Sequence, residues 1–328
     1  MTALCQHFGH FMSSSPALVS VSSVSVADLR LTPPFLALLI TDSLRVQPFS
    51  RYSVNPSWLA VKPLHDTVLK VDIPLESALP VDQSLADSAA SLSARREVRI
   101  TAIQVPVTYE AVLSIVPGLH ARPPVLPPSS DPVLPTPFPP PEGYDLFFHV
   151  GVIGRGSLRM ERVGHKFGYN MKDAVGSLAP IVRISRDEGN QPPDAQRMKV
   201  LRLRDARDYN VESLVEGNET PKRGFGRGYE SFAEEIYTDV DVEKLVHHLK
   251  TCGIDQIYTS MDAGHYLCDF LYYCSLAESK RSTKNDKSTP ASQVIFLHCP
   301  PVGLPLSTEE VTEAIKQSIV WLCRTLTH

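Results

Sequence analysis

The alternation of strand-like and helix-like segments in the last third of the chain constrains its fold more than any other feature. Apolar and amphipathic runs follow one another as helix, strand, helix, strand and helix, at 241–252, 253–260, 262–279, 292–301 and 307–326. Ser307, followed three residues later by Glu310, is a capping-box pattern that marks the start of the last helix. Strands that alternate with helices in this way form parallel sheets covered on both faces. We therefore predict an α/β fold, a single three-layer α/β/α domain with a mostly parallel central sheet.

The first half of the chain adds further strands to this sheet. Strands are expected at 35–41, 95–107 and 144–154, a short helix within 54–64 and a further helix from Tyr109. Within 95–107 the apolar positions first fall on alternate residues from Val98 to Ala102, and then shift to alternate residues from Ile103 to Val107. This pattern predicts a long strand with a change of register along its length.

The domain boundaries follow from composition. Residues 1–34 are rich in Ser and Val without periodicity and are expected to form a poorly ordered N-terminal extension, so that the domain spans 35–328. Two insertions interrupt it. Residues 121–143 are proline-rich and residues 186–231 are charged and Gly-rich, so neither is expected to sustain a helix or strand.

Charge and apolar content argue against nucleic-acid and membrane partners. The 328 residues carry a formal net charge of −4, and the longest apolar run near the N-terminus, Phe35–Ile40, is far shorter than the roughly 20 residues that cross a bilayer. Six cysteines are present, with neither a CxxC motif nor a Cys/His spacing typical of zinc sites. We expect reduced thiols, a cytoplasmic location, and no metal or other cofactor.

Chemistry in such folds lies where strands end and helices begin, which directs attention to Gly151, Ser260 and His298. Cys268 lies in the first turns of a helix expected to start at Asp262, where partial positive charge favours a thiolate. His298 ends an apolar strand before two prolines. A thiolate and a base that later protonates the leaving amine are what nucleophilic peptide hydrolysis needs. By spacing alone, an ordinary buried cysteine and a structural histidine account for the pattern equally well.

Four segments carry a more specific signal than spacing. They are SVNPSWLAVKPL (53–64), HVGVIGRGSLRMERVGHKFGYN (149–170), SMDAGHYLCDFLYYCSLAES (260–279) and FLHCPPVGLP (296–305). In this order they resemble the V-N-P-S-W motif, the H-V-G segment, the nucleophile segment and the catalytic-histidine strand of the pyroglutamyl peptidase I family of cysteine peptidases. The G-H-x-x-G-Y run in the second segment is typical of the eukaryotic members. The resemblance spans about residues 36–328.

The resemblance implies an enzyme that removes an N-terminal pyroglutamyl residue from a peptide through a thioester intermediate. Cys268 matches the nucleophile and His298 the general base of the family. Glu161 matches the acidic residue that orients the histidine and fixes its tautomer. The partner expected from this match is a peptide with N-terminal pyroglutamate. No pattern in the sequence indicates an oligomeric state.

The same resemblance assigns substrate-binding positions. Phe49, Tyr266 and Leu267 match residues of the pocket in which the family holds the lactam ring. Stacking on aromatic rings selects the flat lactam over an open-chain glutamine. His149 and His165 match family positions outside the catalytic set, so packing or hydrogen bonding is expected for both.

The first loop departs from the family pattern. The family has T-G-F-x-P-F after its first strand, whereas here the run from Thr41 to Phe49 lacks the Gly-Phe pair and holds three extra residues. A glycine there lets the backbone approach the substrate closely. Two interpretations therefore stay open: an active pyroglutamyl peptidase of uncertain efficiency, or a catalytically impaired relative that acts as a binding or interaction module.

Overall fold

The computed structural model describes residues 35–42, 55–74, 93–129, 131–134, 137–182, 222–285 and 290–325. They all belong to one compact unit, Pro33–Thr327, and a second unit, Met1–Thr32 with His328, lies outside the described residues. Phe49, the altered first loop after Asp42 and most of the 186–231 insertion also lie outside them. The expectations for these segments remain predictions.

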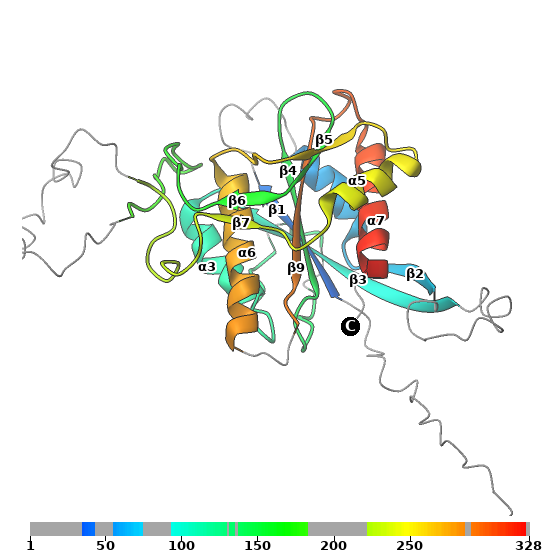
Figure 1. The fold of residues 1–328 in the computed structure, drawn as a ribbon, viewed down its shortest axis with the longest axis horizontal. Helices are drawn as coiled ribbons and strands as arrows, with labels where there is room; N and C mark the ends of the chain where they lie inside the picture. Colours follow the sequence, from blue (N-terminus) through cyan, green and yellow to red (C-terminus); the bar gives the residue numbers. More distant parts are fainter. Residues whose placement is uncertain are drawn as a thin grey trace, which may run out of the picture. The chain divides into compact units, whose positions relative to one another are not determined.

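A seven-stranded sheet forms the middle layer of the described part of the chain, in the order β2-β3-β1-β4-β9-β5-β8 (Figure 1). The strands are β1 (Phe35–Asp42), β2 (Val68–Pro74), β3 (Ser93–Pro106), β4 (Leu146–Val152), β5 (Leu158–Glu161), β8 (Ile257–Ser260) and β9 (Gln293–Cys299). The pairs β3–β1, β1–β4, β4–β9 and β5–β8 are parallel, while β2–β3 and β5–β9 are antiparallel. The predicted mostly parallel sheet is confirmed.

Helices cover both faces of this sheet. They are α1 (Pro56–Val61), the 3-10 turn η2 (Lys62–Leu64), α3 (Tyr109–Leu119), α5 (Val242–Thr251), α6 (Leu267–Asn285) and α7 (Thr308–Thr325). Helices α1, α5 and α7 enclose one hydrophobic core, and α3 and α6 enclose the other (Figure 1). The three-layer α/β/α prediction is confirmed.

Strand β3 shows why its apolar pattern shifts. The alternate residues from Val98 to Ala102 belong to the core under α1, α5 and α7, and those from Ile103 to Val107 belong to the core under α3 and α6. Successive side chains of a strand point to opposite faces. The shift is therefore not a change of register: one regular strand changes the face on which its apolar side chains are buried.

The capping box of α7 is confirmed, but α6 begins later than predicted. Glu310 Oε2 accepts from the backbone N–H of Ser307 at 2.7 Å, and Ser307 Oγ accepts from that of Glu310 at 3.2 Å. Helix α6 starts at Leu267 rather than after Asp262. Asp262 instead accepts from the N–H of Gly264, whose φ of +81° is incompatible with a helix.

Four strands of the structure were not predicted. They are β2, β5 and a separate antiparallel pair, β6 (Val163–His165) and β7 (Glu235–Tyr237). Strand β6 lies directly on α6, because a Cβ atom at Gly164 would come within 2.9 Å of the Tyr273 backbone. The small sheet therefore packs against α6 and stays joined to the central sheet, because Thr238 after β7 donates its hydroxyl to the Val294 carbonyl of β9.

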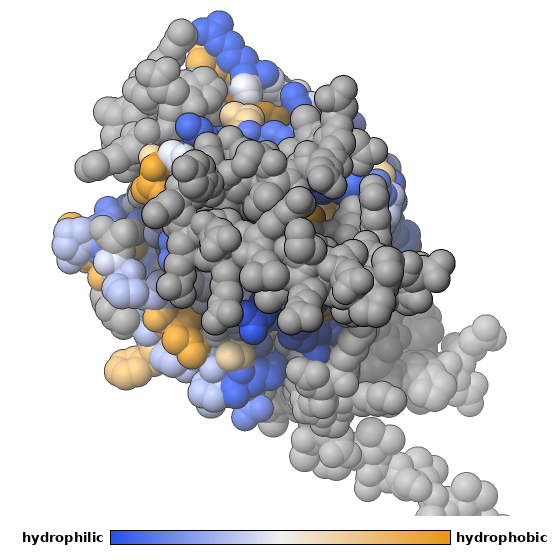
Figure 2. Space-filling model, turned by 90° about the vertical axis from the view of Figure 1, so that its left-hand side faces the viewer, coloured by the Kyte–Doolittle hydropathy of each residue, from blue (hydrophilic) through white to orange (hydrophobic). Residues whose placement is uncertain are grey.

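The proline-rich insertion 121–143 has neither helix nor strand in its described residues. Leu126 and Leu134 nevertheless pack on the two cores, and Lys62 pairs with Asp131 at 2.6 Å. Across the described part of the chain, no helix has both the length and the apolar character to span a membrane. On the face drawn in Figure 2, the coloured residues mix hydrophilic and hydrophobic side chains.

Candidate active site

The candidate residues come from four neighbouring strands that do not all run the same way: β4 and β9 are parallel, whereas β5 and β8 are antiparallel to β9. Gly151 of β4 pairs in register with His298 of β9, and Glu161 of β5 pairs with Ser260 of β8. Because β5 also pairs with β9, Glu161 reaches the neighbourhood of His298 from an adjacent strand. Of the strand ends singled out from the sequence, Gly151 and His298 therefore lie side by side, whereas Ser260 ends a strand that runs opposite to β9 and neighbours Glu161 instead.

His298 and Glu161 form a buried hydrogen-bonded pair. Nδ1–H of His298 donates to Oε1 of Glu161 at 2.8 Å, and the two side chains are 2% and 0% exposed. Tyr272 of α6 donates its hydroxyl to the backbone carbonyl of Glu161 at 3.1 Å and so fixes the end of β5. With Nδ1 committed to Glu161, the other ring nitrogen of His298 faces away from the carboxyl group.

Cys268 lies on the other side of His298. It is the second residue of α6, is half-buried, and makes a side-chain hydrogen bond with His298. Its sulfur rests against β4, because a Cβ atom at Gly151 would lie 2.9 Å from Sγ. Burial opposes protonation of His298, but the hydrogen bonds to Cys268 and Glu161 outweigh it and raise the pKa of the imidazole to about 9.

This arrangement has the parts of a cysteine–histidine–acid triad. A proton on His298 stabilises negative charge on the sulfur, and Glu161 holds the ring in the required tautomer. The first turn of a helix also leaves backbone N–H groups without acceptors inside the helix. Groups of this kind can receive the oxyanion that forms when a thiolate attacks a carbonyl.

The residues matched to the substrate pocket differ in their surroundings. Tyr266 immediately precedes α6, is partly exposed, donates its hydroxyl to the Lys172 carbonyl at 3.2 Å and lies edge-on to Tyr109. Leu267 is 1% exposed and belongs to the core under α3 and α6. Phe49 lies outside the described residues.

The other histidines and the second cysteine of α6 have environments unlike that of the triad. His149 is fully buried and stacks on Phe296; burial lowers its pKa to about 3, so the ring is neutral. Cys274 is also buried, which raises the pKa of its thiol well above the usual value. His165 interacts with Asp269, a residue to which sequence reasoning assigned no role although it directly follows Cys268.

Sequence comparison finds relatives along most of the chain. Pyroglutamyl-peptidase 1 of Homo sapiens is 23% identical over 274 residues, which cover 83% of this chain and 84% of that protein. Pyroglutamyl-peptidase 1 of Mus musculus is 22% identical over 274 residues, with the same coverage. No protein-family model matches the chain.

Structural comparison finds the same fold. A mutant pyrrolidone carboxyl peptidase from Pyrococcus furiosus superposes with a TM-score of 0.51 at 16% identity, covering 89% of this chain and 100% of that one. A second mutant of that protein gives a TM-score of 0.51 at 15% identity with the same coverage. Together with the sequence relatives, this confirms the resemblance inferred from the four motifs. The chain thus resembles pyroglutamyl peptidases in sequence over most of its length and shares the fold of a pyrrolidone carboxyl peptidase.

Proposed function

We propose that this protein is a cysteine peptidase that removes N-terminal pyroglutamyl residues from peptides. The observation that carries the proposal is the convergence of Cys268, His298 and Glu161 from α6, β9 and β5, with His298 in contact with both of the other residues. These residue types in hydrogen-bond contact form a nucleophile, a base and an orienting acid. The curated relatives are named pyroglutamyl peptidases, which supports the same reaction class.

The proposed reaction runs in two steps. The Cys268 thiolate attacks the carbonyl carbon of the pyroglutamyl residue; a C–S bond forms, the peptide C–N bond breaks, and His298 protonates the departing amine. Water then attacks the thioester with His298 as base, which releases pyroglutamate and restores the thiol. Glu161 keeps Nδ1 of His298 protonated throughout, so that the other ring nitrogen exchanges the proton.

The pocket for the lactam ring is proposed to lie beside the start of α6. Tyr266 offers a partly exposed ring next to the nucleophile, and Phe49 is the matching aromatic of the first loop. Leu267 backs Tyr266 and Cys268 from the core. Stacking between aromatic rings adds about 0.5–1.5 kcal/mol beyond burial and favours a flat ring.

A reduced thiol is essential to this chemistry, so we place the protein in the cytoplasm. All the described cysteines are free thiols, namely Cys252, Cys268, Cys274, Cys299 and Cys323. Because a sulfur atom is the proposed nucleophile, the reaction itself uses no metal ion.

The test is hydrolysis of a fluorogenic pyroglutamyl amide by the full chain, with a prolyl amide as the specificity control. We expect release of the fluorophore from the pyroglutamyl amide only, its loss after iodoacetamide, and protection by dithiothreitol. A chelator leaves the rate unchanged. Hydrolysis that survives alkylation of every accessible thiol refutes the mechanism.

The altered first loop favours a second candidate, a catalytically impaired relative that binds peptides. The run from Thr41 to Phe49 lacks the Gly-Phe pair of the family and is three residues longer. This candidate requires binding of a pyroglutamyl peptide without turnover. Calorimetry with a pyroglutamyl peptide, followed by mass analysis of the same sample, separates the two: intact peptide after saturation supports the binding protein, and cleaved peptide supports the enzyme.

A further inference from the structure

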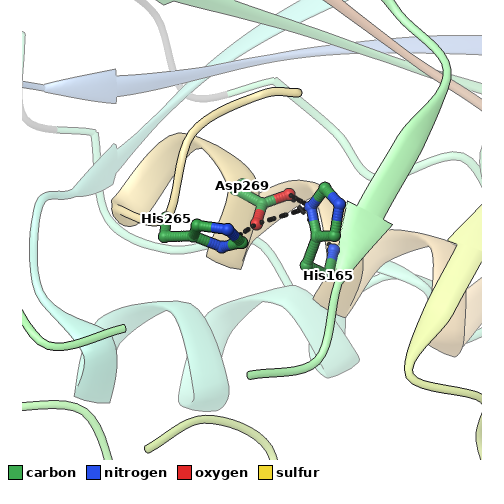
Figure 3. Close-up of side chains that lie close together, drawn as sticks. All are labelled: His165, His265 and Asp269. Atoms are coloured by element: carbon green, nitrogen blue, oxygen red, sulfur yellow. Dashed lines mark hydrogen bonds and ion pairs between the residues drawn. The ribbon is translucent and has the colours of Figure 1, made fainter. Parts of the chain in front are cut away.

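A second cluster of chemically active side chains lies on the opposite side of the first turn of α6. Figure 3 shows His165 of β6 and His265 of the preceding loop with their rings directed at the carboxyl group of Asp269. Nδ1 of His165 lies 3.2 Å from Oδ2 of Asp269, and Nδ1 of His265 lies 3.7 Å from the same oxygen. One candidate ligand atom from each residue lies within 4.8 Å of the other two.

Two of the three separations between the candidate ligand atoms are those expected around a zinc-type ion. Ligand atoms at about 2.0–2.2 Å from zinc and at tetrahedral angles lie about 3.3–3.6 Å apart. The two measured nitrogen–oxygen separations, 3.2 and 3.7 Å, lie just below and just above that range. Imidazole nitrogen and carboxylate oxygen are both ligands that zinc accepts, and three protein ligands leave a fourth position for water.

The carboxyl group is held as a metal ligand usually is. Asp269 is 0% exposed, and Oδ2 also accepts from the hydroxyl of Tyr169 at 3.0 Å. Oδ1 accepts from the backbone N–H of His165 at 3.2 Å, which ties β6 to the helix. Outer hydrogen bonds of this kind orient the first ligands of metal sites.

His265, the third candidate ligand, connects the site with solvent. The side chain of His265 is 50% exposed. Its ring lies against the backbone at Gly168, where a Cβ atom would come within 3.0 Å of Nδ1, and Gly168 has a φ of +106°. Gly168 therefore fixes one face of the His265 ring, while the other face stays open to solvent.

We propose that His165, His265 and Asp269 bind one divalent zinc-type ion at a site that takes no part in the reaction. Neighbouring residues at the start of α6 face different ways: Sγ of Cys268 rests on Gly151 of β4, whereas Asp269 faces β6. The bound ion joins β6, α6 and the loop before α6. Because that loop also carries Tyr266, occupancy fastens the segment beside the proposed pocket.

The site is tested with metal ions alone, in the full-length Cys268→Ala variant, so that the reactive thiol is not a ligand. We expect one Zn²⁺ bound per chain by calorimetry, and the visible absorption of tetrahedral Co²⁺ when Co²⁺ is added instead. Binding to the folded state raises Tm by about 5 °C at a hundred times the Kd. Activity plays no part in these measurements, so the outcome is independent of the proposed function.

Two further substitutions in the same background decide the assignment. His265→Ala removes a half-exposed ligand and is expected to lower the affinity for Zn²⁺ at least about 100-fold and to abolish the Tm shift. Cys252→Ser removes the exposed pair in which His248 Nε2 lies 3.5 Å from Cys252 Sγ, and is expected to change neither. Absence of Zn²⁺ binding in the Cys268→Ala chain overturns the proposal. The proposal is also overturned if His265→Ala keeps its full affinity for Zn²⁺, or if Cys252→Ser loses that affinity.

Discussion

Replacing Gly151 by alanine tests the placement of the nucleophile directly. The added Cβ atom would lie 2.9 Å from Sγ of Cys268 and 2.8 Å from Cζ of Phe296. Unstrained contacts between carbon atoms are about 3.5–4.0 Å long, so each neighbour must move by roughly 0.6 Å or more. A methyl group at this position therefore crowds the sulfur and the Phe296 ring about equally.

The position of Phe296 determines which neighbour moves. Its ring is 0% exposed and packed by His149 at 5.8 Å, Tyr272 at 5.5 Å and His298 at 4.6 Å between ring centroids. Cys268 is only half-buried, so its side chain takes up the strain. Overpacking of this kind costs about 1–3 kcal/mol of unfolding free energy. A displacement of about 1 Å at a reacting atom costs about 10²-fold in rate, so for a shift of roughly 0.6 Å or more we expect kcat/KM to fall at least about tenfold.

The assay is kcat/KM on a fluorogenic pyroglutamyl amide, with the free energy of unfolding from denaturant titration of the same preparations. Gly154→Ala is the neutral control, because no atom of the residues that the structure describes lies within 4 Å of a Cβ there. Gly164→Ala is the crowding control: its Cβ meets the Tyr273 backbone at 2.9 Å and does not touch Sγ of Cys268, so stability falls while kcat/KM falls less than in Gly151→Ala. Wild-type kcat/KM in Gly151→Ala would refute the placement of Sγ against β4.

Three further predictions concern the same site. Cys268→Ala abolishes turnover with Tm unchanged within about 2 °C, whereas Cys274→Ser keeps turnover; the reverse result, from the amide assay and thermal melts, moves the nucleophile to Cys274. The raised pKa of His298 contributes stability that is complete below about pH 6.5 and is lost as the pH rises through about 9, so the denaturation midpoint falls across that window. Glu161→Gln lowers the pKa of His298, so the denaturation midpoint depends less on pH and the alkaline limb of the pH profile of kcat/KM moves to lower pH. An unshifted alkaline limb contradicts the Glu161 assignment. Replacing Asp42–Gln47 with Gly-Phe-Gly restores the family loop and raises kcat/KM at least about tenfold, because a misplaced oxyanion donor costs about 10²–10³-fold; equal rates for the two chains refute this reasoning.

The sequence predicted the sheet and the helices because their local patterns are strong. Each long strand carries an apolar run, and α5 and α7 carry one apolar face each. Strands β6 and β7 have three residues each, too few for a period to be visible. Strand β2, an antiparallel edge strand, does alternate Leu69, Val71 and Ile73 with polar residues, and this pattern was overlooked.

The site residues could be predicted only from the sequence motifs, because hydrophobic periodicity does not distinguish a catalytic residue from a structural one. Nothing in the pattern around Glu161 distinguishes it from a surface glutamate beside Arg162; its burial follows from the antiparallel pairing of β5 with β9, which the sequence does not reveal. The late start of α6 was missed because DAGHYLCDF has helical spacing throughout, whereas the backbone at Gly264 is left-handed.

The later start of α6 changes how its first turn works. With Leu267 rather than a residue near Asp262 opening the helix, Cys268 lies within the first turn, where the helix dipole is felt most strongly. The same turn then presents Cys268 to the central sheet and Asp269 to the small sheet, one residue apart. Tyr272 and Tyr273, one turn further on, repeat this division by donating to Glu161 on one side and to Ala233 on the other. A helix held by hydrogen bonds on both sides cannot rotate without breaking one set, so the position of the sulfur depends on the Asp269 side as well as on His298.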